Sequence, residues 1–148
     1  MNKNWYKTEE EANLAEKLIE KEKDALEKWL NGDTSGYLEL WSKHNFSYFD
    51  GVCEHRVDTH EEVKDFVMKV VEGKLRGKHH EFTNARVQIG VDMAVLTYEL
   101  YQETNLIDVH YNCIEVFQKE ADDWHVIHST WSIKRPMEMD FSGMKELV

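Results

Sequence analysis

Two acidic residues occupy positions where a carboxylate can act as a general acid or base. Glu115 interrupts the otherwise apolar stretch 113–117, and Asp50 directly follows the aromatic pair at 48–49. Apolar surroundings disfavour the ionised form of a carboxylate, which raises its pKa towards the range that is useful for proton transfer. Each residue also has a simpler interpretation. Glu115 can be a solvent-facing or interface acid paired with Lys or Arg, and Asp50 a turn residue ahead of Gly51.

Proton transfer next to a carbonyl also needs a hydrogen-bond donor for the developing enolate, and Tyr98 and His128 are the candidates. A neutral imidazole at His128 can act as an acid, a base or a donor near pH 7. The alternative is that His128 only hydrogen-bonds a side chain on a neighbouring strand. His110 and His128 can approach each other across paired strands, but the sequence supplies no third ligand beside them, so we expect no metal site.

Four aromatic residues can form the wall of a site for a flat apolar ligand. They are Trp41, Tyr48, Tyr98 and Trp131. Arg56 follows in the segment after position 50, where it can hold an anionic group. Core packing of the aromatic residues and a plain surface role for Arg56 are the alternatives. The sequence has no G-x-S-x-G motif, no phosphate-binding glycine loop and no dinucleotide fingerprint, so we expect no cofactor.

The composition restricts the classes of partner. The 148 residues include 18 Lys and Arg against 29 Asp and Glu, which gives a formal net charge of −11. This charge argues against binding to nucleic acid or to anionic membranes, because both require clustered basic residues. The sequence has neither a membrane-spanning apolar stretch nor the apolar run of a secretory signal. Cys53 and Cys113 are far apart in the sequence and favour two free thiols in a reducing cytoplasm.

The first half of the chain carries helical signals. Two capping boxes, at 8–11 and 59–62, each place a Thr three residues before a Glu. Apolar residues recur at helical spacing between 15 and 30, and Asn31-Gly32 ends that run. The sequence therefore predicts a helix at about 9–30, a short helix after Asp33 or Thr34, a strand at 46–49, an irregular loop at 52–58 and a helix at about 60–73.

The second half of the chain changes to a two-residue period. Four long strands are predicted at about 79–89, 93–104, 107–119 and 124–134. The links between them are short, so neighbouring strands are antiparallel. Both faces of these strands carry apolar residues and need cover. We expect three helices on one face and the same sheet of a second copy on the other, which makes the protein an α+β homodimer.

Four local motifs occur in this order of elements: Leu30-Asn31-Gly32-Asp33, Tyr48-Phe49-Asp50, the stretch 92–98 (DMAVLTY) and the stretch 124–132 (WHVIHSTWS). Together they resemble the nuclear transport factor 2-like superfamily over roughly residues 12–135. The SnoaL-like proteins and the calcium/calmodulin-dependent kinase II association domain are the most similar branches. The association domain has a second His on its last strand, where this chain has Thr130. This chain also does not reproduce the basic pocket of the association domain.

The resemblance implies a single domain over 1–148 with a C-terminal extension at 136–148. Its fold is a cone-shaped, cystatin-like roll, in which three N-terminal helices pack on a strongly curved, mostly antiparallel sheet. In that fold Asp50 lies at the lip of a pocket that is open at one end. Glu115, Trp131 and either Tyr98 or Leu100 lie inside the pocket. A one-residue bulge in the last strand would exchange the two faces of that strand.

We therefore interpret the chain as a SnoaL-like pocket protein for a small apolar ligand. It is a candidate cofactor-free lyase, isomerase or cyclase acting on an apolar carbonyl compound. Asp50 or Glu115 would move the proton, and Tyr98 or His128 would donate a hydrogen bond. The alternative is a non-catalytic dimeric module that binds a ligand or only associates, and a pocket floor filled by large side chains would favour it.

Overall fold

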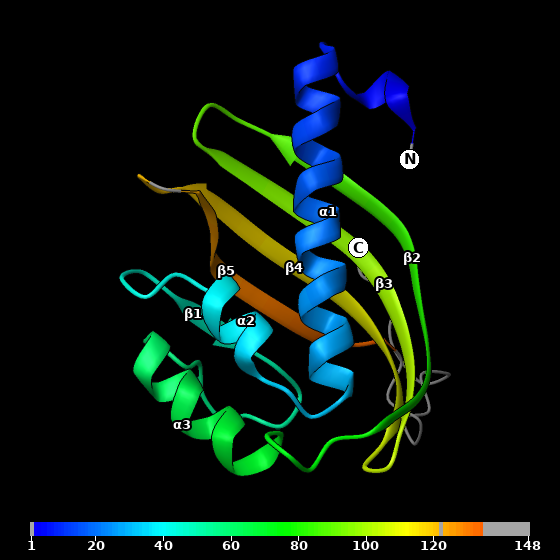
Figure 1. Cartoon of the computed structure of the whole chain (residues 1–148), viewed down its shortest axis with the longest axis vertical. Coiled ribbons are helices and arrows are strands. Elements are labelled where there is room, and N and C mark those ends of the chain that lie inside the picture. The colour runs from blue at the N-terminus through cyan, green and yellow to red at the C-terminus, as the bar shows by residue number, and fades with distance from the viewer. Residues whose placement is uncertain (1, 122, 135–148) are drawn as a thin grey trace, which may run out of the picture.

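The computed structural model describes residues 2–121 and 123–134 (Figure 1). The predicted C-terminal extension lies outside these residues. In chain order the elements are η1 (Lys3–Trp5), α1 (Glu9–Leu30), α2 (Ser35–Leu40), β1 (Ser47–Phe49), α3 (His60–Val70), β2 (Gly77–Ile89), β3 (Met93–Thr104), β4 (Asp108–Lys119) and β5 (Trp124–Ile133). No helix of the described part is long and apolar enough to cross a membrane. The α+β class and the order of elements confirm the prediction.

The two long helices begin where their capping boxes predict. The Thr8 hydroxyl accepts a hydrogen bond from the Glu11 amide at 3.1 Å, and Thr59 accepts one from the Glu62 amide at 3.1 Å. Each bond satisfies an amide that the first turn of a helix leaves without a partner. At its other end α1 stops at Gly32, whose φ of 75° suits glycine.

The short helix and the third helix differ in detail from the prediction. Thr34 takes the N-cap position of α2 but makes no capping bond with its side chain. Its hydroxyl instead donates to Glu72 at 2.6 Å, which ties the start of α2 to the segment after α3. α3 ends at Val70, three residues before the predicted Gly73.

The five strands form one sheet in the order β1-β5-β4-β3-β2. β2 to β5 are an antiparallel meander, as predicted, whereas β1 pairs in parallel with β5. α1 lies along one face of the sheet, and α2 and α3 lie beside β1 and β5 (Figure 1). On β3, alternate side chains from Ala94 to Thr104 are buried on the side of the helices, while the others are half-buried or exposed.

Besides a register shift near the start of β2, between Gly77 and His79, two shifts interrupt the sheet further along its strands. The first lies on β2 between Thr83 and Arg86, where Asn84 has a φ of 55°. The second lies where β4 pairs with β5, because Val116 faces His128 while Phe117 faces Val126. The extra residue on β5 mixes the two predicted faces of that strand. Trp124 and Val126 are buried before the bulge, and Ser129 and Trp131 are buried after it.

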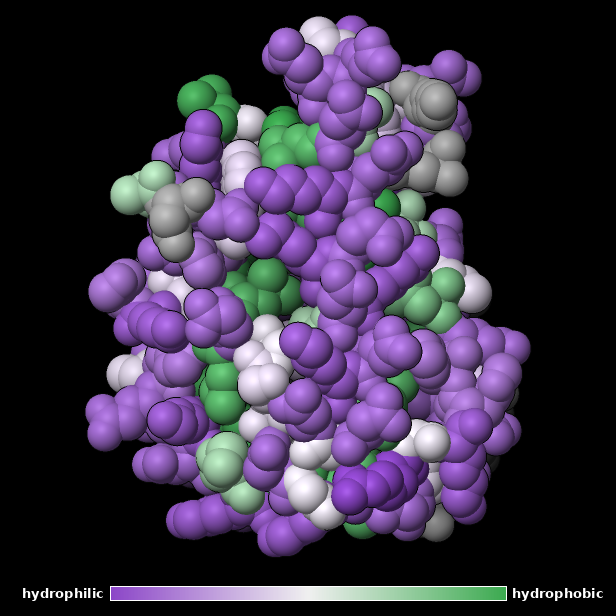
Figure 2. Space-filling model, in the orientation of Figure 1, coloured by the Kyte–Doolittle hydropathy of each residue, from purple (hydrophilic) through white to green (hydrophobic). Residues whose placement is uncertain are grey.

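Aromatic residues from both layers fill much of the space between the helices and the sheet. The rings of Trp29, Tyr37 and Trp131 lie 5.4–6.1 Å apart, and Trp41 stacks between Tyr37 and Phe46. The opposite side of α1 is covered mostly by hydrophilic side chains (Figure 2). The Glu- and Lys-rich side of the helix therefore faces water.

Candidate functional site

A small cavity opens at the end of the roll where β1, α3 and the β3–β4 hairpin meet. Its volume is about 100 Å³ and its lining is mainly apolar. The lining residues are Trp29, Tyr48, Asp50, Val52, Phe66, Val70, Val71, Leu75, Gln102, Leu106, Ile107, Tyr111 and Trp131. We call this space the mouth cavity. It brings together residues that are up to about a hundred positions apart in the sequence.

The rim of the mouth cavity is apolar and open to solvent. The exposed fractions are 68% for Val52, 56% for Leu106 and 50% for Ile107, and Val70 is also exposed. Large apolar side chains that cluster around an opening usually mark a place where an apolar molecule binds. The rim therefore favours an apolar ligand entering at this end of the roll.

Asp50 is held in a fixed orientation at the edge of the cavity. The Tyr48 hydroxyl donates to its Oδ2 at 2.5 Å, and the amides of Val52 and Cys53 donate to its Oδ1 at 2.7 and 2.9 Å. Burial, together with the nearby carboxylate, raises the pKa of Tyr48 well above its usual value, so this phenol stays protonated and continues to donate. Asp50 thus combines the predicted turn role with a position in the cavity wall.

Two polar residues that the sequence analysis did not select also line the mouth cavity. Tyr111 comes from β4, and its pKa is raised to about 12, first by burial and then by the charge of Asp50. Gln102 comes from β3 and is 4% exposed, and its Oε1 has no hydrogen-bond partner among the described residues. A neutral phenol and a primary amide therefore share an apolar cavity with a carboxylate.

A second polar cluster lies deeper, between α1 and the sheet. It is built on the fully buried side chains of Glu22 and Glu115. The hydroxyls of Tyr37 and Tyr98 both donate to Glu22 Oε1, the first at 2.8 Å. The Ser129 hydroxyl donates to Glu115 Oε1 at 2.6 Å. We call these residues the inner acid cluster.

The two carboxyl groups of the inner acid cluster favour the protonated form. Burial raises the pKa of Glu22 to about 7, although the two tyrosine hydrogen bonds act in the opposite direction. Burial and the charge of Glu22 raise the pKa of Glu115 well above its usual value. Among the described residues no Lys or Arg forms an ion pair with either group. The prediction that the apolar context of Glu115 raises its pKa is therefore supported.

Trp131 stands between the mouth cavity and the inner acid cluster. Its ring contributes to the cavity wall and packs edge-on against Tyr111, with 5.4 Å between the ring centroids. Its indole N–H donates to the Ser129 hydroxyl at 3.0 Å, which in turn donates to Glu115. Glu115 and Tyr98 do not line the mouth cavity, so the structure separates them from Asp50.

Comparison with known proteins shows the family of the chain. The family model described as a SnoaL-like domain matches residues 23–136, most of the chain. The chain belongs to the SnoaL-like domain family. No curated protein is significantly similar to it in sequence.

Solved structures of the nuclear transport factor 2-like fold resemble this SnoaL-like domain. A candidate ketosteroid isomerase from Parabacteroides distasonis has a TM-score of 0.73 and 25% identity, over 93% of this chain and 96% of that one. A nuclear transport factor 2-like protein of unknown function from Pseudomonas putida has a TM-score of 0.71 and 14% identity, over 86% and 91% of the two chains. A candidate calcium/calmodulin-dependent kinase II association domain from Exiguobacterium sibiricum has a TM-score of 0.63 and 12% identity, over 88% and 98%. The predicted resemblance is confirmed.

Besides Glu115 and Tyr98, three more predicted site residues of the SnoaL-like domain lie away from the mouth cavity. Trp41 is buried in the aromatic core. Arg56 is exposed and pairs with Asp58 at 2.5 Å. His128 bonds the hydroxyls of Ser47 and Thr130 at 2.7 and 2.6 Å on the face of the sheet opposite the helices, which matches the simpler interpretation of this residue. Burial lowers its pKa, so the ring is neutral there.

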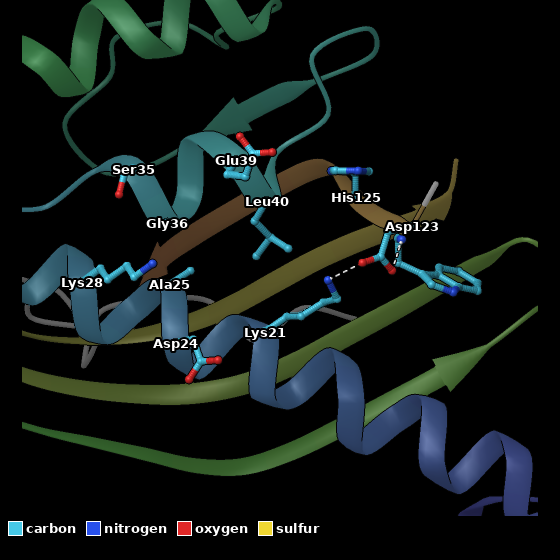
Figure 3. Close-up of a pocket in the computed structure, with 11 residues that line it drawn as sticks. Lys21, Asp24, Ala25, Lys28, Ser35, Gly36, Glu39, Leu40, Asp123 and His125 are labelled. Atoms are coloured by element: carbon cyan, nitrogen blue, oxygen red, sulfur yellow. Dashed lines mark hydrogen bonds and ion pairs between the residues drawn. The ribbon is translucent and has the colours of Figure 1, made fainter. Parts of the chain in front are cut away.

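The SnoaL-like domain also has a wider groove between α1, α2 and the start of β5 (Figure 3). Its volume is about 320 Å³, but charged side chains line much of it. Lys21 reaches across to Asp123 at 2.8 Å, and Lys17 binds the same carboxylate at 2.9 Å. These ion pairs join α1 to the turn between β4 and β5, so the groove is a solvated contact between the two. None of the predicted site residues lines it.

Side chains that could bind a metal ion do not cluster in the described part of the chain. Nowhere in residues 2–121 and 123–134 do three His, Cys, Asp or Glu side chains gather in a way that could hold a metal ion. Cys53 and Cys113 are free thiols. Burial raises the pKa of Cys53 to about 12, so it is a poor nucleophile at neutral pH.

Proposed function

We propose that this SnoaL-like domain binds a small apolar carbonyl compound in the mouth cavity, and that Asp50 moves a proton at the carbon next to the carbonyl. The observation that carries the proposal is that the fixed Asp50 carboxylate and the Tyr111 phenol line one apolar cavity. The similarity to a candidate ketosteroid isomerase supports it, because ketosteroid isomerisation is a proton transfer of this kind.

The proposed reaction needs only residues of the mouth cavity. The Asp50 carboxylate removes a proton from the carbon beside the carbonyl, and the electrons of that C–H bond form the C=C bond of an enolate. The Tyr111 hydroxyl donates a hydrogen bond to the enolate oxygen, where the negative charge develops. Protonated Asp50 then returns the proton to the same carbon or to a conjugated one. The fixed orientation of Asp50 supports this role because it lowers the cost of reaching the reactive geometry.

The size of the cavity limits the ligand. Pockets for drug-sized ligands usually measure about 300–1,000 Å³, whereas an engineered cavity of about 150 Å³ holds one benzene ring. A cavity of about 100 Å³ with an open rim therefore suits a single ring or a short branched chain. A cavity of this volume leaves no room for a fused four-ring compound. Trp131, Tyr98 and Leu100 are all buried inside the roll, and an interior filled by such large side chains favours the alternative without catalysis.

Proton exchange at the carbon beside a carbonyl tests the proposal without knowledge of the natural substrate. In D₂O the protein is expected to speed the loss of the α-proton NMR signals of cyclohexanone. The Tyr111→Phe variant is expected to be slower by about 100-fold, because it loses the donor to the enolate oxygen. Tyr101 lies on β3 and points to the face of the sheet opposite to Tyr111. Tyr101→Phe is therefore the matched control and should exchange at the wild-type rate. Equal rates for Tyr111→Phe and the wild type would exclude Tyr111 from the reaction.

The outer face of the sheet supports the second part of the proposal, a homodimer. Val95 and Val116 are direct neighbours across β3 and β4, and Met93 and Ile114 beside them are each 39% exposed. An apolar strip of this kind on a sheet suits the same strip of a second copy. It is also the observation that favours the alternative function, a dimeric module that binds a ligand without turning it over. The two free thiols support a location in a reducing compartment such as the cytoplasm.

The dimer can be tested by sedimentation. The wild type is expected at twice the chain mass of 17.6 kDa at micromolar concentration. Ile114→Lys should sediment as a monomer, because it places a charge in the centre of the apolar strip. Asn13→Lys, on the exposed side of α1, should remain a dimer. A wild type that is still a monomer at about 100 μM would contradict the proposed interface.

A further inference from the structure

Gln102 is a buried amide whose side chain makes no hydrogen bond among the described residues. It lies on β3 in line with Tyr98 and Leu100, and its side chain is 4% exposed in the wall of the mouth cavity. Its Oε1 is fully buried and has no hydrogen-bond partner among the described residues. No hydrogen bond from its Nε2 occurs within that part of the chain either. A buried amide without partners costs free energy, and folded proteins rarely leave one unexplained.

The surroundings of Gln102 indicate what it would bind. The cavity wall next to it is apolar, formed by residues such as Leu75, Leu106 and Trp131. In the sheet order β1-β5-β4-β3, Gln102 lies on β3 and Asp50 follows β1, with β5 and β4 between them. The two groups therefore approach a bound molecule from opposite sides, and Tyr111 on β4 lies between them.

We infer that Gln102 selects ligands that carry a second polar group, a hydroxyl or carbonyl, on the side of the molecule away from the carbon that loses its proton. This inference rests on the proposed function, because it takes the mouth cavity as the ligand site. A primary amide offers both donors and an acceptor, so it can pair a hydroxyl in either direction. An apolar ligand without that group leaves the amide unpaired, and a site built in this way rejects it.

A matched pair of ketones separates the role of Gln102 from that of the cavity. 4-Hydroxycyclohexanone and 4-methylcyclohexanone differ only in a hydroxyl against a methyl group of similar size. Their affinities are measured by NMR titration on the wild type and on the Gln102→Met variant, which removes the amide but keeps the side-chain length. The variant is expected to bind the hydroxy ketone about tenfold more weakly. Its affinity for the methyl ketone should be unchanged or higher.

A second readout does not depend on any ligand. Gln102→Met is expected to melt at the wild-type temperature or above it, because it removes a buried group that has no partner. Gln88→Met, at an exposed position of β2, is the matched control. A clear drop in melting temperature for Gln102→Met alone would show that the amide has a structural partner and would overturn the inference.

The outcomes distinguish the inference from the proposed function. If both ketones bind the wild type and Gln102→Met weakens neither, or weakens both equally, the selective role of Gln102 is wrong and the cavity remains a ligand site. If neither ketone binds the wild type, the proposed function fails and the inference fails with it. A loss confined to the hydroxy ketone supports both.

Discussion

The Asp50→Asn variant is expected to lose the α-proton exchange of cyclohexanone by a factor of about 10²–10⁴ relative to the wild type. The amide has nearly the same shape as the carboxylate, and its oxygen can still accept from the amides of Val52 and Cys53. The amide of Asn cannot accept a proton from carbon, so the lower exchange rate measures the loss of the general base. The rate is measured by NMR from the disappearance of the α-proton signals in D₂O.

Asp65→Asn is the matched control for this experiment. Asp65 is exposed on α3 and does not line the mouth cavity, so its variant should exchange at the wild-type rate. Cyclohexanone should bind Asp50→Asn with an affinity within a few-fold of the wild type, because the apolar wall is unchanged. Exchange that survives in Asp50→Asn would transfer the base role to another group, and exchange lost equally in Asp65→Asn would indicate a general effect on the fold.

The free energy of unfolding is expected to fall as the pH rises from about 4.5 to about 7. The unfolded chain releases the Glu22 proton near its ordinary pKa of 4.5, whereas the folded chain holds it up to about 7. Between these values the folded state binds more protons, so raising the pH favours unfolding. Glu22 alone contributes roughly 3 kcal/mol to this fall, at 1.36 kcal/mol per pH unit. Glu115 acts in the same direction because its pKa is also raised.

Urea unfolding followed by tryptophan fluorescence at several pH values between 4.5 and 8 measures this effect. The Glu22→Gln, Glu115→Gln double variant should show a nearly flat profile over that range and should be more stable than the wild type at pH 8. Glu16→Gln, exposed on the same helix as Glu22, should keep the wild-type slope. A wild-type profile that rises with pH, or a double variant with the same slope, would contradict the buried protonated acids.

A separate acid limit is expected below that range. Lys21 and Lys17 bind Asp123 and hold its pKa well below its usual range, although partial burial acts in the opposite direction. The stability from this group is present above the ordinary aspartate pKa and is lost at lower pH.

Structural features that a local pattern determines could be predicted from the sequence. Both capping boxes begin their helices, and the change from a period of 3.6 to a period of 2 marks the start of the sheet. Glu115 was recognised because a charge stands out in an apolar strand. These features depend on residues within a few positions of one another, so a single sequence contains them.

Glu22 was missed although the sequence holds a signal for it. Leu18, Glu22 and Leu26 follow one another at four-residue spacing, which places the acid on the apolar side of α1. The helix has many Glu and Lys residues, so a single buried acid does not stand out among them. On β4 Tyr111 points to the same face as Glu115, and on β3 Gln102 points to the same face as Leu100. The sequence thus shows which face of the sheet they occupy, but not that a cavity lies there.

The position of the cavity depends on side-chain packing that cannot be predicted from the sequence pattern. Trp131 divides the interior into the mouth cavity and the inner acid cluster, and this division rests on where its ring packs against Trp29, Tyr37 and Tyr111. The bulge on β5 sets the direction of Trp131, and no residue in that stretch signals the bulge. Tyr98 and Asp50 are one of the acid and donor combinations that the sequence left open. Tyr98 bonds Glu22 in the inner acid cluster, whereas Asp50 lines the mouth cavity.

Titration of ¹⁵N-labelled protein with cyclohexanone tests the central claim most directly. The claim is that the mouth cavity, with Asp50 in its wall, is the ligand site. The account predicts that the indole signals of Trp29 and Trp131 and the amide signals of Val52 and Cys53 shift together and saturate, while the indole signal of Trp124 in the charged groove stays in place. Shifts confined to Trp124 and its neighbours, or no saturable shift at all, would contradict it.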